Sequence, residues 1–369
     1  MTKVPFSRRS FLKASAGLSA AALVSPRFAF CSTPGLYVPL DSVPHKRTWM
    51  AWPDSTAIWG RRLLTGIQAN IALIAKTIAK YEPVIMCANS ASVSKAQSMC
   101  GSSVTVIGTI PVDDCWMRDS GPVFRVNGAG ALDCVGLNFN GWGNKQTHAK
   151  DALVASRVAA YVGVPFTAAG LVTEGGAIET DGDGTLMATQ SSIMNSNRNP
   201  GVTQAQIEAA MNAAFGTSKV IWFPGIAGQD ITDDHVDATS RFTADATGLV
   251  QWPQTADTDI FSNDERQQYQ TLSTSTDAQG KAIQVTKLLG PDYNEIRSTN
   301  PNFVGSYANY YLCNGAVISA QFGDADSDAG AKATLATIFP GRVIEQLNID
   351  NLGGGGGGIH CVTQPQPLP

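Results

Sequence analysis

Residues 181–223 read DGDGTLMATQSSIMNSNRNPGVTQAQIEAAMNAAFGTSKVIWF, and this stretch contains the structural pattern that recurs along the chain. The DGDG sequence at its start favours a hairpin turn between two strands. Thr203 and Gln206 have the spacing of a capping box, which predicts that a helix begins there. The apolar run at 220–223 then predicts a further strand. The stretch therefore indicates two paired strands, a helix and a third strand.

Similar apolar runs and amphipathic stretches alternate over the rest of the chain. We predict strands at 82–87, 104–108, 132–138, 184–189, 220–223, 249–252, 316–321 and 342–347. We predict helices at 61–81, at 151–162, from 203 onward, and from 327 or 328 to 339. The pattern recurs at intervals of roughly 60 to 75 residues, which indicates an α/β array of similar units without an interdomain linker. The polar stretch at 253–286 is expected to form an elaborated surface region.

The first 30 residues have the features of an export signal. Paired Arg8 and Arg9 precede a short Ala-rich apolar stretch that is too short to remain as a membrane-spanning helix. We therefore predict a twin-arginine signal at 1–30 and a single domain at 31–369, delivered folded to the periplasm or secreted. A buried helix is the alternative, and the two arginines and Pro26 disfavour it.

Charge and cysteine content limit the classes of partner. The predicted signal holds five of the 26 basic residues and no acidic one, so 21 basic and 30 acidic residues remain, a net charge of −9. An acidic, exported protein is a poor candidate for nucleic acid or anionic membrane and suits a small cationic ligand. The seven cysteines form no C-x-x-C pair. We expect reduced thiols, with neither a disulfide framework nor a zinc site.

Six consecutive glycines at 353–358 run into Ile359, His360 and Cys361 near the C-terminus. Glycine tolerates positive φ and a close approach of the backbone to a ligand, so the run is typical of a tight loop at a binding site. A flexible, low-complexity tail is the alternative. Taken alone, this stretch leaves open whether Cys361 is a nucleophile.

A second polar motif, at 233–237, places His235 and Asp237 two residues apart. On an extended segment these side chains point to the same face, and a carboxylate beside a histidine stabilises the imidazolium that acid–base catalysis requires. A solvated acidic loop and a metal site are the alternatives. The chain contains three other histidines and no H-x-x-x-H spacing, which disfavours the metal site.

Further carboxylates and aromatic residues stand at predicted turns. Asp119 follows Trp116 and Arg118, and a buried aspartate there requires a cation, either Arg118 or a substrate. Glu174 stands at a strand end beside two glycines, where an ordinary turn glutamate is the alternative. Trp142 lies in an aromatic and polar turn of the kind that lines pockets.

A thiol, a base and an acid fit a Cys–His–Asp acyltransferase or protease as well as an enzyme that acts on a planar cation. The surplus of carboxylates distinguishes these two kinds of enzyme. An acyl-transfer site requires hydrogen-bond donors for an oxyanion, whereas paired carboxylates match a planar cation. The residues therefore favour a guanidinium substrate.

The sequence resembles the agmatine deiminase family, which is related to the bacterial peptidylarginine deiminases, across nearly all of residues 35–367. The matching segments are PHKRTWMAWP at 44–53, WMRDSGP at 116–122, FNGWG at 139–143, EGG at 174–176, NRNP at 197–200, DHVD at 234–237 and GGGIHCVTQ at 356–364. The resemblance implies the pentein α/β propeller fold, a pseudo-fivefold ring of ββαβ units around a central active site.

The resemblance also implies a role for each candidate residue. Cys361 would attack the guanidinium carbon, so that ammonia leaves and a covalent S-alkylthiouronium remains. His235 would protonate the leaving amine and then activate water. Asp119 and Asp237 would hold the guanidinium nitrogens, and Glu174 would orient His235 and raise its pKa. No metal or cofactor is needed.

The remaining expectations concern the substrate. Trp116 would line its alkyl chain, and Trp142 would belong to the same substrate-binding region. Cys361 would ionise only when the cationic substrate is bound, because nearby carboxylates raise the pKa of a free thiol. The expected partner is a small cationic guanidine, without nucleic acid and, after signal removal, without membrane. A homodimer is left open.

The chain departs from the family pattern in three places. Its glycine run is longer than usual, so the loop before Cys361 is expected to be unusually mobile; prolines follow Gln364; and the family's agmatine enzymes typically lack an export signal. The stretch after Asn140 carries no arginine, as on the agmatine side of the family. The leading prediction is hydrolysis of agmatine to N-carbamoylputrescine and ammonia. The alternatives are an exported peptidylarginine deiminase that forms citrulline, a non-catalytic guanidine-binding protein, and a Cys–His–Asp amidase or protease.

Overall fold

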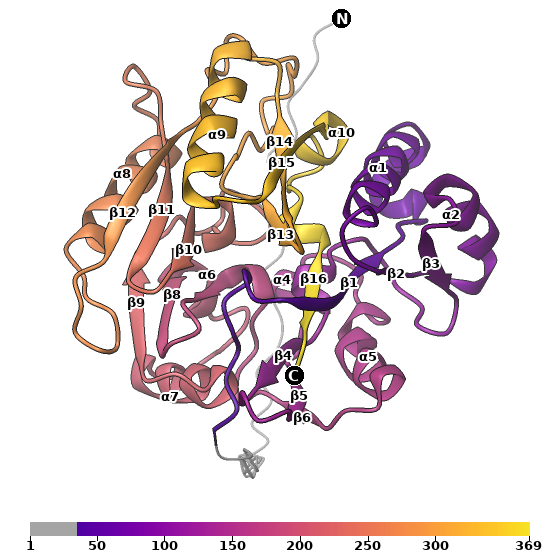
Figure 1. Ribbon diagram of the computed structural model, residues 1–369, viewed down its shortest axis with the longest axis horizontal. Coiled ribbons are helices and arrows are strands. Elements are labelled where there is room, and N and C mark those ends of the chain that lie inside the picture. The colour runs from indigo at the N-terminus through magenta and orange to yellow at the C-terminus, as the bar shows by residue number, and fades with distance from the viewer. Residues whose placement is uncertain (1–34) are drawn as a thin grey trace, which may run out of the picture.

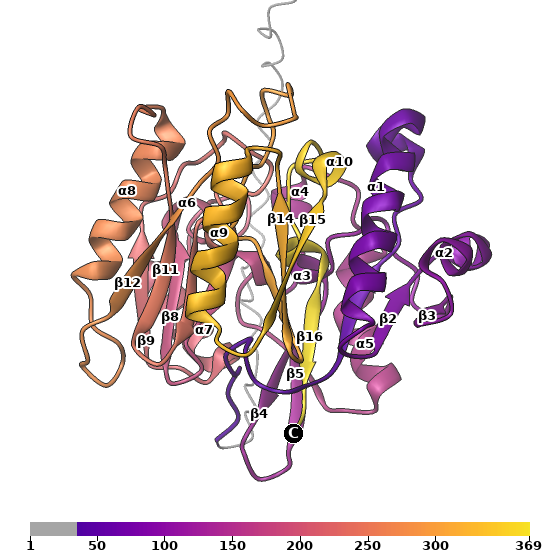
Figure 2. The ribbon, with the colours of Figure 1, turned by 45° about the horizontal axis from the view of Figure 1, so that its top comes forward.

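The computed structural model describes residues 35–369, which form five β-sheets arranged in a ring (Figure 1). In each sheet an antiparallel pair of strands is followed by a parallel strand, and a helix connects the parallel pair. The helices that connect the parallel strands lie on the outside of the ring (Figure 1 and Figure 2). This arrangement confirms the predicted ring of ββαβ units. The predicted signal at 1–30 lies outside the described residues.

Four of the units follow the same order of elements. They consist of β4 (Val123–Val126), β5 (Leu132–Gly136), α5 (Val154–Val162) and β6 (Phe166–Ala168); β7 (Ile178–Thr180), β8 (Thr185–Thr189), α7 (Gln204–Phe215) and β9 (Lys219–Phe223); β10 (Ser240–Ala244), β11 (Thr247–Trp252), α8 (Ile260–Ser273) and β12 (Gln284–Leu289); and β13 (Tyr311–Cys313), β14 (Ala316–Gln321), α9 (Ala325–Ile338) and β15 (Val343–Asn348).

The remaining unit joins the two ends of the described chain. It consists of β16 (Gln364–Pro367), β1 (His45–Ala51), α1 (Thr56–Ile78), β2 (Val84–Cys87), α2 (Val93–Cys100) and β3 (Val104–Ile107). Strand β16 pairs antiparallel with β1, opposing Trp49 to Gln364 and Thr48 to Pro365. Strand β16 lies at the edge of its sheet. No described strand pairs with its outer side, so the backbone N–H groups that its prolines lack are not needed there. The C-terminal strand therefore closes the ring.

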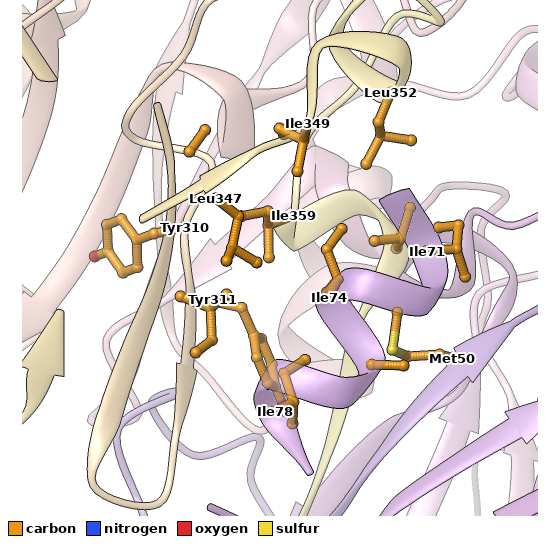
Figure 3. Close-up of a cluster of buried hydrophobic side chains, with 14 of the residues drawn as sticks. Met50, Ile71, Ile74, Ile78, Tyr310, Tyr311, Leu347, Ile349, Leu352 and Ile359 are labelled. Carbon is orange, nitrogen blue, oxygen red and sulfur yellow. The ribbon is translucent and has the colours of Figure 1, made fainter. Parts of the chain in front are cut away.

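The largest apolar cluster surrounds α1. Figure 3 shows Ile74 and Ile78 of α1 among the side chains of Tyr311, Leu347 and Ile359, and all five belong to this cluster. The predicted periodic face of the helix is therefore confirmed as a core face. This packing joins the first unit to the last and supports the segment that precedes Cys361.

Local signals in residues 181–223 are also confirmed. The hairpin turn joins β7 and β8, and Thr203 and Gln206 form the capping box at the start of α7. Among the described helices, none combines the length and the apolar character that a membrane span requires.

The stretch 253–286, predicted only as an elaborated surface region, contains the helix α8, which the sequence pattern did not indicate. The buried face of α8 is largely polar and includes Asp264, Glu265 and Gln268. Gln268 accepts hydrogen bonds from the hydroxyl groups of Thr239 and Ser240. A helix buried through polar contacts gives no hydrophobic periodicity, so the sequence pattern did not reveal it.

Candidate active site

A short turn precedes the first strand of every unit, and these five turns meet at the centre of the described ring. They are α3 (Met117–Ser120), η3 (Gly175–Ala177), η4 (Val236–Ala238), the segment 306–310 and η5 (His360–Val362). In chain order they bring Asp119, Glu174, His235 with Asp237, Asn309 and Cys361 to the candidate site. The fivefold repeat of the fold therefore supplies one polar cluster from five distant parts of the sequence.

His235 lies between two carboxylates. Its Nε2 atom is 3.2 Å from Oε2 of Glu174, and its Nδ1 atom is 3.7 Å from Oδ1 of Asp119. Burial lowers the pKa of this imidazole, but Asp119 and the hydrogen bond to Glu174 outweigh burial and raise the pKa to about 9. His235 is therefore protonated at neutral pH and is able to act as a general acid.

Asp119 is fixed by two donors from other turns. Its Oδ2 atom accepts a hydrogen bond from Nε1 of Trp142 at 2.9 Å, and its Oδ1 atom accepts one from the backbone N–H of Gly176 at 3.0 Å. Burial raises the pKa of Asp119 to about 6, and Asp237 and Glu174 oppose its ionisation further while His235 favours it. A bound cation would favour the carboxylate form at this position.

Asp237 presents one free oxygen. Its Oδ2 atom lies 2.7 Å from Nδ1 of His360, whereas its Oδ1 atom is buried without a hydrogen-bond partner among the described residues. Burial raises the pKa of Asp237, but the hydrogen bond and charge of His360 bring it below its usual value. An ionised, buried and unpaired carboxylate oxygen is a site that a cationic donor would satisfy.

Cys361 has the position of a nucleophile beside this carboxylate. Its Sγ atom lies 3.7 Å from Oδ2 of Asp237 and 3.2 Å from Nδ2 of Asn309. Burial, followed by Asp237 and Asp119, raises the pKa of the thiol well above its ordinary value. Of the described cysteines, the others are buried and Cys361 is partly exposed. The residue is therefore partly accessible, and a cation nearby would favour ionisation of its thiol.

Gly176 lies at the centre of the polar groups. A Cβ atom built on it would come within 2.8 Å of His235 Nδ1, 2.9 Å of Asp119 Oδ1 and 3.0 Å of Asp237 Oδ2. Any side chain at this position would therefore collide with three of the candidate groups. The glycine allows base and carboxylates to approach the same point.

The glycine run that precedes Cys361 is closely packed. Gly353 is the last residue of a short helix, α10 (Asp350–Gly353), and not part of an irregular loop. A Cβ atom on Gly357 would overlap the ring of Trp116, and one on Gly358 would overlap the side chain of Asn309. The run that we expected to be mobile therefore forms part of the wall of the site.

Aromatic side chains form the rest of that wall. The rings of Trp116 and Trp59 are 6.0 Å apart between centroids, and those of Trp142 and Phe139 are 4.9 Å apart with their planes nearly perpendicular. Trp142 itself has a positive φ of 55°, an uncommon conformation for a bulky residue. This conformation turns its indole N–H toward Asp119.

Three residues behind the site had no role predicted from the sequence. Arg198 and His360 stand in the quoted motifs, and Asn309 was not singled out. Arg198 donates from Nε to both oxygens of Glu174, at 2.8 and 2.9 Å. His360 contacts Asp237, and Asn309 contacts both Cys361 and the backbone carbonyl of Asp237. Asn309 lies just before β13, in the segment that corresponds to the other four turns. This position in the repeat is the signal that indicates it.

One local expectation was wrong. His235 and Asp237 do not share an extended strand, because η4 begins at Val236; His235 precedes this turn and Asp237 lies within it. Cys361 lies in the turn η5, before β16. Of the two cations considered for Asp119, Arg118 pairs elsewhere, since its Nη2 atom lies 3.2 Å from Oδ2 of Asp41. Among the described residues, no group of three or more His, Cys, Asp and Glu is arranged to hold a metal ion.

Comparison with known proteins places this site in a family. The sequence model of the Porphyromonas-type peptidyl-arginine deiminase family matches residues 37–367, and that of twin-arginine signal sequences matches residues 5–25. The agmatine deiminases of Stutzerimonas stutzeri and Pseudomonas fluorescens are each 32% identical to the chain, over 92% of this chain and 98% of theirs. The structure of the Enterococcus faecalis agmatine deiminase has a TM-score of 0.83, with 26% identity over 90% of this chain and 96% of that one. The chain therefore belongs to the agmatine deiminase family, and its ring is the pentein fold.

Proposed function

We propose that the protein hydrolyses the guanidinium group of agmatine to N-carbamoylputrescine and ammonia, with Cys361 as the nucleophile. The observation that carries the proposal is the position of the Cys361 thiol, 3.7 Å from an ionised Asp237 and in one cluster with a protonated His235. A planar cation between Asp119 and Asp237 would be held by charge-assisted hydrogen bonds. Its central carbon would then face the sulfur.

The electrostatics support activation of the thiol by the substrate. Asp237 and Asp119 oppose ionisation of Cys361 in the free protein, because they raise the pKa of its thiol beyond the effect of burial. A bound guanidinium would offset both negative charges and favour the thiolate next to the electrophilic carbon. The unliganded protein would thereby keep its thiol unreactive.

His235 has the properties that both half-reactions need. As an imidazolium it would donate its proton to the leaving nitrogen, so that ammonia departs and the covalent thiouronium forms. As the neutral base it would then take a proton from the attacking water, and the carbonyl product and the Cys361 thiol would be released. Glu174 holds the ring through Nε2 in either case.

One contact favours agmatine over peptidylarginine. Recognition of a peptide carboxylate requires a free cation near the entrance, and Lys145 is the basic residue in the stretch that follows Asn140. Its Nζ atom already lies 2.7 Å from Oδ2 of Asp233 and 3.0 Å from the Ile231 carbonyl. A lysine paired in this way would bind a carboxylate only after losing its acidic partner.

The direct experiment is an ammonia assay with agmatine, free arginine and a peptide with a C-terminal arginine. We expect release from agmatine with the highest kcat/KM, together with formation of N-carbamoylputrescine. Release from the peptide alone would reverse the assignment to citrulline formation. Tight calorimetric binding of agmatine without turnover would instead support a guanidine-binding protein.

The partner and the location follow from the same assignment. We infer a small cationic guanidine as the ligand, without nucleic acid or membrane, because residues 31–369 carry the excess of negative charge. The match to twin-arginine signals supports export to the periplasm or secretion of a single domain at 31–369. Fractionation of cells that express the full chain tests the location, and light scattering tests whether the protein is a homodimer.

A further inference from the structure

We propose that His360 is a positioning residue for the reaction: it holds one oxygen of Asp237 so that the other oxygen faces the guanidinium. This inference rests on the proposed function, since it concerns the same site. His360 adjoins the nucleophile in the sequence, yet its ring makes no bond to the Cys361 thiol. It acts through the carboxylate.

The ring of His360 is clamped at both nitrogens. Nδ1 lies 2.7 Å from Oδ2 of Asp237, and Nε2 lies 3.2 Å from Oδ2 of Asp41. Its side chain is 1% exposed, and its backbone N–H donates to Oδ1 of Asn309 at 2.9 Å. Both facing groups are carboxylates, so each ring nitrogen lies against an acceptor and the two contacts hold the ring in one orientation.

The far side of the ring is anchored by further charges. Asp41 also accepts from Nη2 of Arg118 at 3.2 Å and from Nη2 of Arg241 at 3.3 Å. Oε1 of Glu179 lies 3.8 Å from Nε2 of His360 and forms an ion pair with Nε of Arg241 at 2.7 Å. These contacts fix the position of Asp41, and through His360 they fix Asp237.

The consequence lies at the free oxygen of Asp237. Oδ2 is occupied by His360, so the orientation of the carboxylate leaves Oδ1 unpaired and available to a ligand. The charged groups that favour ionisation of Asp237 are His360, His235 and Arg241, and the neighbouring carboxylate is Asp119, whose own pKa Asp237 raises. Loss of His360 would release the carboxylate to rotate and would raise its pKa.

Two isosteric variants separate the two bonds of the ring. In His360→Asn the amide nitrogen takes the place of Nδ1 and keeps the donor to Asp237. In His360→Gln it takes the place of Nε2 and keeps the donor to Asp41. We expect His360→Gln to raise the KM for agmatine about tenfold while kcat falls less, and His360→Asn to stay within about threefold of wild type.

The pH profile gives a second readout. Asp237 must be ionised to bind the cation, so activity is lost as the pH falls through its pKa. Because His360 lowers that pKa, His360→Gln should move the acid limb of kcat/KM to higher pH and make it steeper, since Asp119 and Asp237 then take up protons in the same range. Asp41→Asn should shift the limb in the same direction by less.

A measurement without turnover distinguishes this proposal from the proposed function. Calorimetry of agmatine with Cys361→Ala, alone and combined with His360→Gln, should show a roughly tenfold rise in Kd in the double variant. Equal Kd values would overturn the role of His360, whereas absence of ammonia release by wild type would overturn the function. The positioning role is also wrong if the Asn and Gln variants are equally impaired, because burial alone would not distinguish them.

His45 provides a matched control. It is a buried histidine whose Nδ1 atom lies 3.1 Å from Oε1 of Glu82 and whose Nε2 atom lies 3.0 Å from the Asp41 carbonyl, and it contacts no group at the reacting centre. In His45→Gln the amide nitrogen takes the place of Nε2, so the contact with the Asp41 carbonyl is kept and the contact with Glu82 is lost; this variant should lower the melting temperature and leave the KM and the acid limb unchanged. If it reproduced the His360→Gln profile, general loosening of the core would explain both, and the positioning role would be wrong.

Discussion

Nε2 of His235 lies 3.2 Å from Oε2 of Glu174, and both oxygens of that carboxylate accept hydrogen bonds from Nε of Arg198. The proposed general acid is thus held by a carboxylate that is itself held by a buried guanidinium. Burial raises the pKa of Glu174, but its bonds to His235 and Arg198 outweigh burial and lower it. These contacts keep Glu174 ionised, and its carboxylate in turn keeps His235 protonated.

Replacing Glu174 with glutamine should lower the pKa of His235. The folded pKa is raised to about 9, so the imidazolium donates below that pH and its activity is lost as the pH rises through it. Without the carboxylate, the basic limb of kcat should move down by about one pH unit, since hydrogen bonds to charged groups contribute ~1.5 kcal/mol or more. A pH profile between 6 and 10 measures this, and an unmoved basic limb would exclude His235 as its origin.

Replacing Arg198 with methionine should destabilise the fold. Arg198 and Glu174 are fully buried, and Arg198 also donates to Asp233 and to the Thr232 carbonyl. Breaking a buried pair by removing one partner costs about 3–5 kcal/mol, because the other charge stays buried. Urea unfolding measures the loss.

The exposed pair of Lys281 and Asp245 is the control for that experiment. Lys281→Met should leave the urea midpoint unchanged, because solvent screens the pair. Equal stabilities of the Arg198 and Lys281 variants would show that burial of the Arg198 pair has no energetic consequence.

The packing of the glycine run predicts an effect of Gly357→Ala on the site. The added Cβ would overlap the Trp116 ring, so either the ring or the loop that carries Cys361 must move. We expect kcat/KM for agmatine to fall at least about tenfold, since displacement of a reacting group by roughly 1 Å costs up to a hundredfold. Gly330 in α9 has no atom within 4 Å of a built Cβ, and Gly330→Ala should retain full activity. Full activity of both variants would contradict the close packing.

The sequence allowed the strands and helices with apolar periodicity to be predicted. Strand β14 covers the predicted residues 316–321, and α7 begins at the predicted capping box. Helix α8 was missed because Asp264, Glu265 and Gln268 occupy its buried face. Tertiary hydrogen bonds, which no local pattern encodes, replace hydrophobic contacts there.

The site was predictable to the extent that its residues stand in recognisable motifs. Cys361 follows the glycine run, His235 stands among aspartates, and Asp119 follows Trp116 in the sequence. Asn309 and Asp41 have no such neighbours, and their contacts arise only when the ring brings separate units together. The partners of buried charges are therefore the part that the sequence did not predict.

The central claim is that agmatine is hydrolysed through a covalent bond to Cys361. The most direct measurement is mass spectrometry of an acid-quenched reaction with agmatine, on the intact protein and on its proteolytic peptides, performed on wild type and on Cys361→Ala, with ammonia release followed in parallel. We predict that wild type carries a thiouronium adduct on the peptide that contains Cys361, and that the variant shows neither adduct nor turnover while remaining folded by circular dichroism. Normal ammonia release by Cys361→Ala would contradict the account.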